Sequence, residues 1–229
     1  EVIVQARREI PSEIRHAIQR GTIYYLNKPY EWPQLRALVQ AAESSRELRR
    51  SLKARVSEIQ DIVRLLDTAT LELRSLDEAE VVAAHLGAAA GDPQLGIGVL
   101  ELLINAVEHG NLGISYDEKS RLRESGDYER HIAQRRASEE HRDKLVTVVL
   151  SRDGDDLEVL ISDQGQGFDF QRYLDFDRNR VFDSHGRGVL LARGLLEVEF
   201  LPPGNRVRVR LPLAKPEADE GTAGGQPAS

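Results

Sequence analysis

The sequence predicts an α/β protein on two observations. Near the N-terminus, an apolar strand, a helix and a second apolar strand follow one another over residues 2–26, which is the pattern of half an α/β unit. Between residues 68 and 211, stretches that alternate like strands are interleaved with stretches of helical periodicity. Sheets and helices are therefore expected in both parts of the chain.

The composition of the 229 residues excludes several classes of function. The chain has no cysteine, which rules out disulfides, thiolate metal sites and cysteine nucleophiles. Its formal charge of -7 argues against a protein that binds nucleic acid by broad phosphate neutralisation. Because no apolar run approaches the roughly 18 residues of a membrane span, we expect no membrane segment and a cytoplasmic location. The chain holds no methionine and opens on Glu1, so we expect a piece of a longer protein.

The first elements come before residue 67. Strands are expected at residues 2–4 and 23–26, with a helix at 11–19 between them. A long helix should follow, because residues 34–66 contain neither glycine nor proline. Its apolar residues recur at alternating intervals of four and three, namely Leu52, Val56, Ile59, Val63 and Leu66. This seam favours a homodimer through helix 33–66; the alternative is one helix that lies on its own domain.

The later elements follow from capping and turn signals. A strand is expected at 68–74, and a capping box of Ser75 and Glu78 should open a helix to about residue 90. Asp92 and Pro93 should open another helix that runs to His109, with Gly110 as a left-handed cap. The charged residues 111–143 look like an insertion. Strands at 145–150 and 157–162, a helix at 188–196 and a strand at 207–211 complete the order, and residues 214–229 should be disordered.

Three short segments carry chemistry. In the first, Glu101, Asn105 and His109 share one helix face, and a carboxylate one turn before an amide makes a pair of oxygen ligands. An ordinary solvated face is the alternative. In the second, Asp163 follows a strand and could accept from an exocyclic amine such as that of adenine. Gly165 and Gly167 would let a ligand approach the backbone, although a plain tight turn is possible.

The third segment is a glycine-rich helix start. Gly186, Arg187 and Gly188 open an apolar helix, where exposed N–H groups and the helix dipole favour an anion such as phosphate. The alternative is a simple connection into a packed helix. The segment is neither a P-loop, since it lacks the Gly-Lys-Ser/Thr ending, nor a dinucleotide fingerprint, since no βαβ unit surrounds it.

In this order the three segments resemble the N, G1 and G2 boxes of the histidine-kinase-like (Bergerat, GHKL) ATPase family over residues 67–213. The Glu101–Asn111 segment is most similar to bacterial anti-sigma-factor serine/threonine kinases. The resemblance implies a two-layer α/β sandwich with a mixed sheet covered on one side by helices. ATP would lie between the Asn105 helix and a lid at residues 168–185. The insertion at 111–143 departs from a minimal member and leaves the partner surface open.

The resemblance also implies roles for individual residues. Asn105 would hold Mg²⁺, which needs only one or two protein ligands beside phosphates and water. Glu101 would be the general base, and Asp163 would accept from the adenine amine. The remaining ATP-binding residues would be His109 beside the N box, Gly165 and Gly167 at the base and ribose, and Gly186, Arg187 and Gly188 at the phosphates.

Residues 1–42 resemble the C-terminal half of a response-regulator receiver domain. In that resemblance Lys28 would be the phosphate-contacting lysine and Tyr25 the switch aromatic residue, while Ala6 stands where the family carries its switch hydroxyl. The alternative is an ordinary α/β fragment. The expected domain order is a partial receiver at 1–42, a linker and dimerisation helix at 43–66, the ATPase domain at 67–213 and the tail at 214–229.

Together these features favour a two-component-type signalling regulator. We expect a receiver-controlled serine/threonine protein kinase of anti-sigma type that uses ATP and Mg²⁺. Its protein partner would be a sigma factor or an anti-sigma antagonist, with neither nucleic acid nor a membrane as a partner. A sensor histidine kinase is disfavoured because none of the six histidines lies in 33–66. A module that sequesters a partner without catalysis is the other alternative, and it would not need Glu101 as a base.

Overall fold

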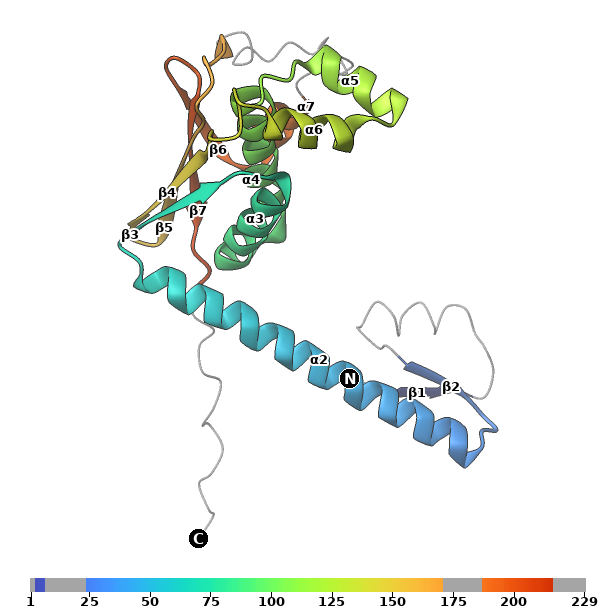
Figure 1. Ribbon diagram of the computed structural model, residues 1–229. Coiled ribbons are helices and arrows are strands. Elements are labelled where there is room, and N and C mark those ends of the chain that lie inside the picture. The colour runs from blue at the N-terminus through green and yellow to red at the C-terminus, as the bar shows by residue number, and fades with distance from the viewer. Residues whose placement is uncertain (1–2, 7–23, 171–186, 216–229) are drawn as a thin grey trace. The chain divides into compact units, whose positions relative to one another are not determined.

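The computed structural model describes residues 3–6, 24–170 and 187–215, and its contacts divide the chain into two units, 1–58 and 59–229 (Figure 1). In the first unit, strands β1 (Ile3–Ala6) and β2 (Tyr24–Asn27) pair in parallel, with Val4 opposite Tyr25. Parallel neighbours need a crossover between them, which agrees with the expected strand–helix–strand order. The helix expected at 11–19 lies outside the described residues.

Helix α2 (Trp32–Leu65) confirms the long helix and passes from the first unit into the second. The apolar seam predicted along this helix is exposed in its first part and buried in its second. Leu52 and Val56 are exposed by 52% and 38%, whereas Val63 is buried in the core of the second unit and Ile59 packs against that core. The prediction of one continuous dimer seam is therefore wrong for the last two turns, because the core of the second unit covers them. Only the part of the seam before Ile59 is open to a partner.

The second unit contains a five-stranded sheet in the order β3-β4-β5-β7-β6. Its strands are β3 (Thr68–Leu73), β4 (Val146–Asp153), β5 (Asp156–Ser162), β6 (Glu197–Leu201) and β7 (Arg206–Pro212). All four pairings are antiparallel, where a mixed sheet was expected. The reason is local for two of them, since β4–β5 and β6–β7 are joined by short turns and hairpin neighbours run in opposite directions.

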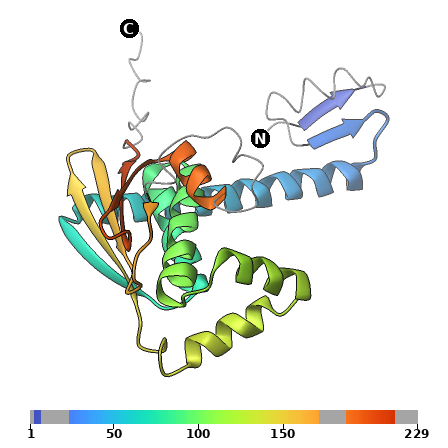
Figure 2. The same ribbon diagram turned by 90° about the horizontal axis from the view of Figure 1, so that it is seen from above.

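Helices α3 (Leu76–Ala90), α4 (Pro93–Asn105) and α7 (Arg187–Leu195) cover one face of this sheet (Figures 1 and 2). The inward residues of the strands alternate with exposed or half-buried ones, as in Val146, Val148 and Leu150 of β4. They pack against α4, where Val99 and Leu103 are fully buried. The two-layer α/β sandwich is confirmed. In the described part of the chain, no helix has both the length and the hydrophobicity that crossing a bilayer requires.

Both helix starts follow the predicted caps. The Ser75 hydroxyl accepts from the backbone N–H of Glu78, whose carboxylate accepts from the N–H of Ser75 in return. The Asp92 carboxylate accepts from the N–H of Gln94. Helices α3 and α4 then approach closely, because a Cβ atom on Gly96 would stand 2.8 Å from the carbonyl oxygen of Ala83. The capping residues and this glycine contact fix where α4 begins and how deep it lies.

The end of α4 differs from the expectation. The helix does not stop at a left-handed Gly110 but widens into a π-helical turn, η1 (Ala106–Asn111), whose Gly110 is not left-handed. Two short helices follow, α5 (Tyr116–Ser125) and α6 (Tyr128–Ala137), joined by Gly126 at a φ of 75°. The charged segment is thus a helical hairpin, inserted between η1 and β4.

Candidate functional site

One cavity of about 620 Å³ opens where α4 and η1 meet the turn after β5 and the turn between β6 and β7. Five of the site residues expected from the sequence line it: Asn105, His109, Asp163, Gly165 and Gly167. Its apolar walls come from residues such as Leu102, Ile161, Val189 and Phe200. A concave, largely apolar pocket with a few converging polar groups is the usual form of a small-molecule site.

Asp163 lies directly after β5 and is held from both sides. Its N–H donates to the carbonyl of Asn205 at 3.0 Å, and the Asn205 side chain donates to the Asp163 carbonyl at 3.1 Å. Its carboxylate accepts from the N–H of Gly165 at 2.8 Å. Burial raises the pKa of Asp163 to about 6, against the opposing effects of the Gly165 hydrogen bond and the Lys144 charge. The result is a fixed, poorly solvated acceptor at the cavity wall.

Glycines allow close contacts between the segments that form this wall of the cavity. A Cβ atom on Gly110 would collide with the carboxylate of Asp163, and one on Gly165 would collide with the carbonyl of Gly110. Gly167 has a φ of 78°, and its turn packs on the backbone of Pro203. Only residues without side chains fit at these contacts, so η1 and the turn after β5 pack closely against each other. The glycines therefore fix the position of the Asp163 carboxylate at the cavity wall.

His109 lines the cavity, and its Nε2 atom is buried. Its Nδ1 donates to the carbonyl of Ile114, which fixes the tautomer, and burial lowers the pKa of the ring. Nε2 has no hydrogen-bond partner among the described residues. The ring of Tyr116 lies 4.0 Å from that of His109, centroid to centroid. A neutral His109 therefore carries a buried acceptor at Nε2 that no described residue uses.

The sequence did not predict a network of hydrogen bonds along the cavity wall. The Asn111 side chain accepts from the N–H of Gln164 at 2.7 Å, and the Gln164 side chain accepts from the N–H of Leu145 at 2.9 Å. Lys144 donates to the carbonyl of Asn111 at 3.1 Å. These bonds join η1, the start of β4 and the turn after β5. The polar residue types beside the Asp163 and Asn105 segments were the only available signal, because the partners are distant in sequence.

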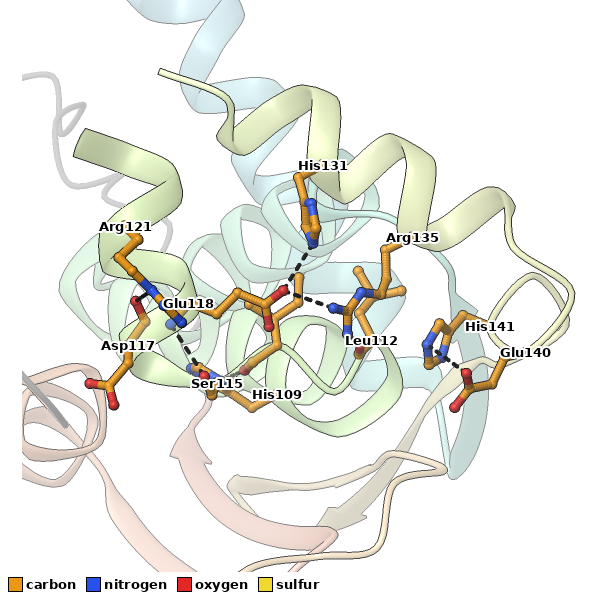
Figure 3. Close-up of polar contacts among 11 residues, drawn as sticks. His109, Leu112, Ser115, Asp117, Glu118, Arg121, His131, Arg135, Glu140 and His141 are labelled. Atoms are coloured by element: carbon orange, nitrogen blue, oxygen red, sulfur yellow. Dashed lines mark hydrogen bonds and ion pairs between the residues drawn. The ribbon is translucent and has the colours of Figure 1, made fainter. Parts of the chain in front are cut away.

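The inserted segment contributes to the site mainly through the residues on either side of its helical hairpin. Glu118 of α5 pairs with His131 at 3.1 Å and with Arg135 at 2.8 Å, both on α6 (Figure 3). Arg135 also donates to the carbonyl of Leu112 at 3.0 Å. Glu140 and His141 follow α6 and line the cavity. The Oε2 atom of Glu140 lies 3.7 Å from Nε2 of His141. The insertion is therefore part of the cavity wall.

Glu101 stands apart from the described cavity lining. It lies one turn before Asn105 on α4 and faces the first turn of α7, where a Cβ atom on Gly188 would be 3.4 Å from its Cδ atom. The G2-like segment thus approaches α4 at Glu101, whereas the G1-like segment meets η1 at Gly110. Gly186 and the lid expected at 168–185, from residue 171 onward, lie outside the described residues, as does the side chain of Arg187.

The receiver-like residues belong to the first unit. Lys28 is exposed just after β2, and the backbone of Tyr25 pairs with β1. The side chain of Tyr25 lies outside what the structure describes.

The cavity fits a nucleotide with Mg²⁺. Asp163 offers an acceptor for an amine, residues such as Leu102 and Ile161 offer an apolar wall for a base, and Asn105 offers one amide oxygen at the same cavity. Among the described residues no three His, Asp or Glu side chains gather as metal ligands. A metal here would therefore take most of its ligands from phosphate and water, which is the coordination Mg²⁺ prefers.

Comparison with known families agrees with this geometry. The family model described as the histidine kinase-like ATPase domain matches residues 51–211. The chain belongs to the histidine kinase-like ATPase family, and its second unit is an ATP-binding domain of that class. No curated protein matches the chain significantly.

Proposed function

We propose that this protein is an ATP-dependent serine/threonine protein kinase of the anti-sigma-factor type, controlled by a receiver domain. The observation that carries the proposal is the position of Glu101. It lies on the helix that brings Asn105 to the cavity, one turn earlier, and it faces Gly188 at the start of α7. A carboxylate one turn from the metal ligand and beside the phosphate segment is placed to act on a substrate hydroxyl.

The roles of the residues follow from this arrangement. Asp163 accepts from the adenine amine and so selects the base. Asn105 would hold Mg²⁺, which would neutralise negative charge on the phosphates of ATP, the phosphoryl donor. Glu101 accepts the proton of a serine or threonine hydroxyl as that oxygen attacks the γ-phosphorus atom. The bond to the ADP oxygen then breaks, and ADP leaves with the negative charge.

Control would come through α2 and the receiver-like unit. The exposed Leu52 and Val56 support a homodimer between two copies of α2 over the part of the seam that the ATPase core leaves open. Lys28 and Tyr25 support phosphorylation-dependent control by the receiver. A sigma factor or an anti-sigma antagonist would be the substrate or binding partner.

The test is Glu101→Gln, which keeps the size of the side chain and removes its basicity. We expect ATP affinity within a few-fold of wild type and phosphoryl transfer to partner proteins lowered by about 10²–10⁴. The matched control is Glu80→Gln on the exposed side of α3, which should change neither quantity. Equal transfer by wild type and Glu101→Gln would reject the base role. Tight ATP binding without transfer to any partner would favour a sequestering module instead.

A further inference from the structure

The turn η1 contains a fully buried carboxylate that the proposed mechanism does not use. Glu108 has 0% of its surface exposed. Its carboxylate forms an ion pair with Lys119 of α5 and accepts a hydrogen bond from the hydroxyl of Tyr128 at the start of α6. Burying a charge costs several kcal/mol unless it is paired and hydrogen-bonded. Both partners come from the inserted hairpin, so the hairpin satisfies this charge.

The contact with Glu108 also changes the pKa of Tyr128. Burial, the hydrogen bond to Glu108 and the negative charge of Glu108 raise the pKa of the phenol well above its usual range. The phenol therefore remains a donor at any physiological pH. Lys119 is itself mostly buried, with 17% of its side chain exposed. The three groups form a polar cluster in which the carboxylate is fully buried and its two partners are partly buried.

The residues after Glu108 form the wall of the nucleotide cavity. His109 lines the cavity, Gly110 packs against the carboxylate of Asp163, and the Asn111 side chain accepts from the N–H of Gln164. A π-helical turn is rare and needs support from its surroundings. The backbone of η1 continues into the loop through a bond from the N–H of Ile114 to the carbonyl of Glu108 at 2.9 Å. A shift of Glu108 would therefore move the base-binding wall.

We propose that Glu108 is a positioning residue for the base-binding end of the nucleotide site, acting through η1 on Asp163. The inference rests on the proposed binding of adenine by Asp163. Glu108 is not among the residues that line the described cavity, and its oxygens face Lys119 and Tyr128 instead. It therefore acts by holding Gly110 and Asn111 in place. The phosphate end, at Asn105 and Gly188, precedes η1 on α4 or lies on α7 and should be less affected.

Base discrimination tests this role. Asp163 should favour ATP, whose 6-amino group donates, over GTP, whose 6-oxo group does not. Affinities for Mg·ATP and Mg·GTP are measured by displacement of a fluorescent ATP analogue, with wild type, Glu108→Gln, Tyr128→Phe and Glu118→Gln. A loss of folded protein would lower the apparent affinities for both nucleotides by the same factor. Misplacement of Asp163 would instead lower the ratio of ATP affinity to GTP affinity (the ATP:GTP ratio).

We expect Glu108→Gln to lower the ATP:GTP ratio about tenfold and Tyr128→Phe about threefold, since each weakens a charge-assisted bond. Glu118→Gln, the matched control within the hairpin, should keep the wild-type ratio, because Glu118 pairs with α6 and does not contact η1. An unchanged ratio in Glu108→Gln overturns the proposal; if that variant does not fold, an unchanged ratio in Tyr128→Phe does so. Wild-type protein that binds no ATP overturns the proposed function itself, before any variant is compared.

Discussion

Gly110 and Asp163 are 53 positions apart in sequence, yet a Cβ atom on Gly110 would stand 2.7 Å from the Cβ atom of Asp163. The end of one helix and the end of one strand thus form a single wall. The identity of residue 110 is set by this contact and not by a left-handed backbone.

Substitution of Gly110 tests that wall. Gly110→Ala should push the Asp163 side chain from its position and lower ATP affinity about tenfold to a hundredfold, the cost of losing a charged acceptor. The control is Gly194→Ala on α7, where a Cβ atom would meet nothing within 4 Å. Calorimetry with Mg·ATP measures both variants. Normal affinity in Gly110→Ala would mean that the wall yields without moving Asp163.

This contact also shows what the sequence could predict. The capping residues Ser75 and Asp92 and the alternation in β4 and β5 are local signals, and they located most elements correctly. The π-helical turn is not local: in an uninterrupted α-helix Glu108 lies seven positions after Glu101 and shares its side, yet the structure buries it. Strand β6 was missed because a short strand with two glutamates on one side gives a weak signal.

The site itself was predicted only as a set of residues. Asn105, His109 and Asp163 were identified by type and spacing, and the structure brings them to one cavity. Asn111 and Gln164 were not, since their bond depends on tertiary contact alone. The prediction of a dimer seam along α2 was wrong in its last two turns for the same reason. Periodicity identifies an apolar stripe, but it does not say whether a partner or the chain's own core covers that stripe.

The raised pKa of Asp163 predicts that Asp163→Asn stabilises the nucleotide-free protein. An unfolded carboxyl titrates near 4 and the folded one at about 6, so between these values the folded state binds more protons. Stability should therefore fall as pH rises through this window, and above it the ionised group costs about 1–3 kcal/mol. Asn keeps the acceptor for Gly165 without the charge.

Thermal unfolding without nucleotide measures this effect. At pH 7.5 the Asp163→Asn variant should melt several degrees higher than wild type, at about 2–4 °C per kcal/mol for a chain of this size. At pH 4.5 the difference should nearly vanish, because the wild-type carboxyl is protonated. A lower melting temperature at both pH values would contradict the expected burial cost.

The proposed role of Asn105 as a Mg²⁺ ligand predicts how removal of the metal changes ATP affinity. With Mg²⁺ present, Asn105→Ala should bind ATP about tenfold more weakly than wild type, since one polar ligand is lost. In EDTA the two proteins should bind ATP equally, because no metal remains for the amide to hold. Calorimetry in both buffers makes each protein its own control. A loss of affinity in EDTA as well would assign Asn105 to the nucleotide and not to the metal.

The divided seam predicts two different outcomes along one helix. Leu48 lies four residues before Leu52 on α2, outside the seam as predicted but at the same spacing. Leu48→Glu with Leu52→Glu places charges at positions that are exposed by 61% and 52%, so the protein should become a monomer in light scattering. The melting temperature of the ATPase domain should stay the same. Val63→Glu should instead unfold that domain, because Val63 lies in its core. A dimer that survives the paired leucine substitution would place the interface elsewhere.

The cluster of Glu108, Lys119 and Tyr128 restricts how this domain can be shortened. Excising residues 116–137 as a dispensable loop would remove both partners and leave a carboxylate against an apolar interior. A trimmed chain would need an uncharged residue at position 108 as well. Loop length and the identity of residue 108 should therefore change together, both in laboratory minimisation and in the divergence of natural chains.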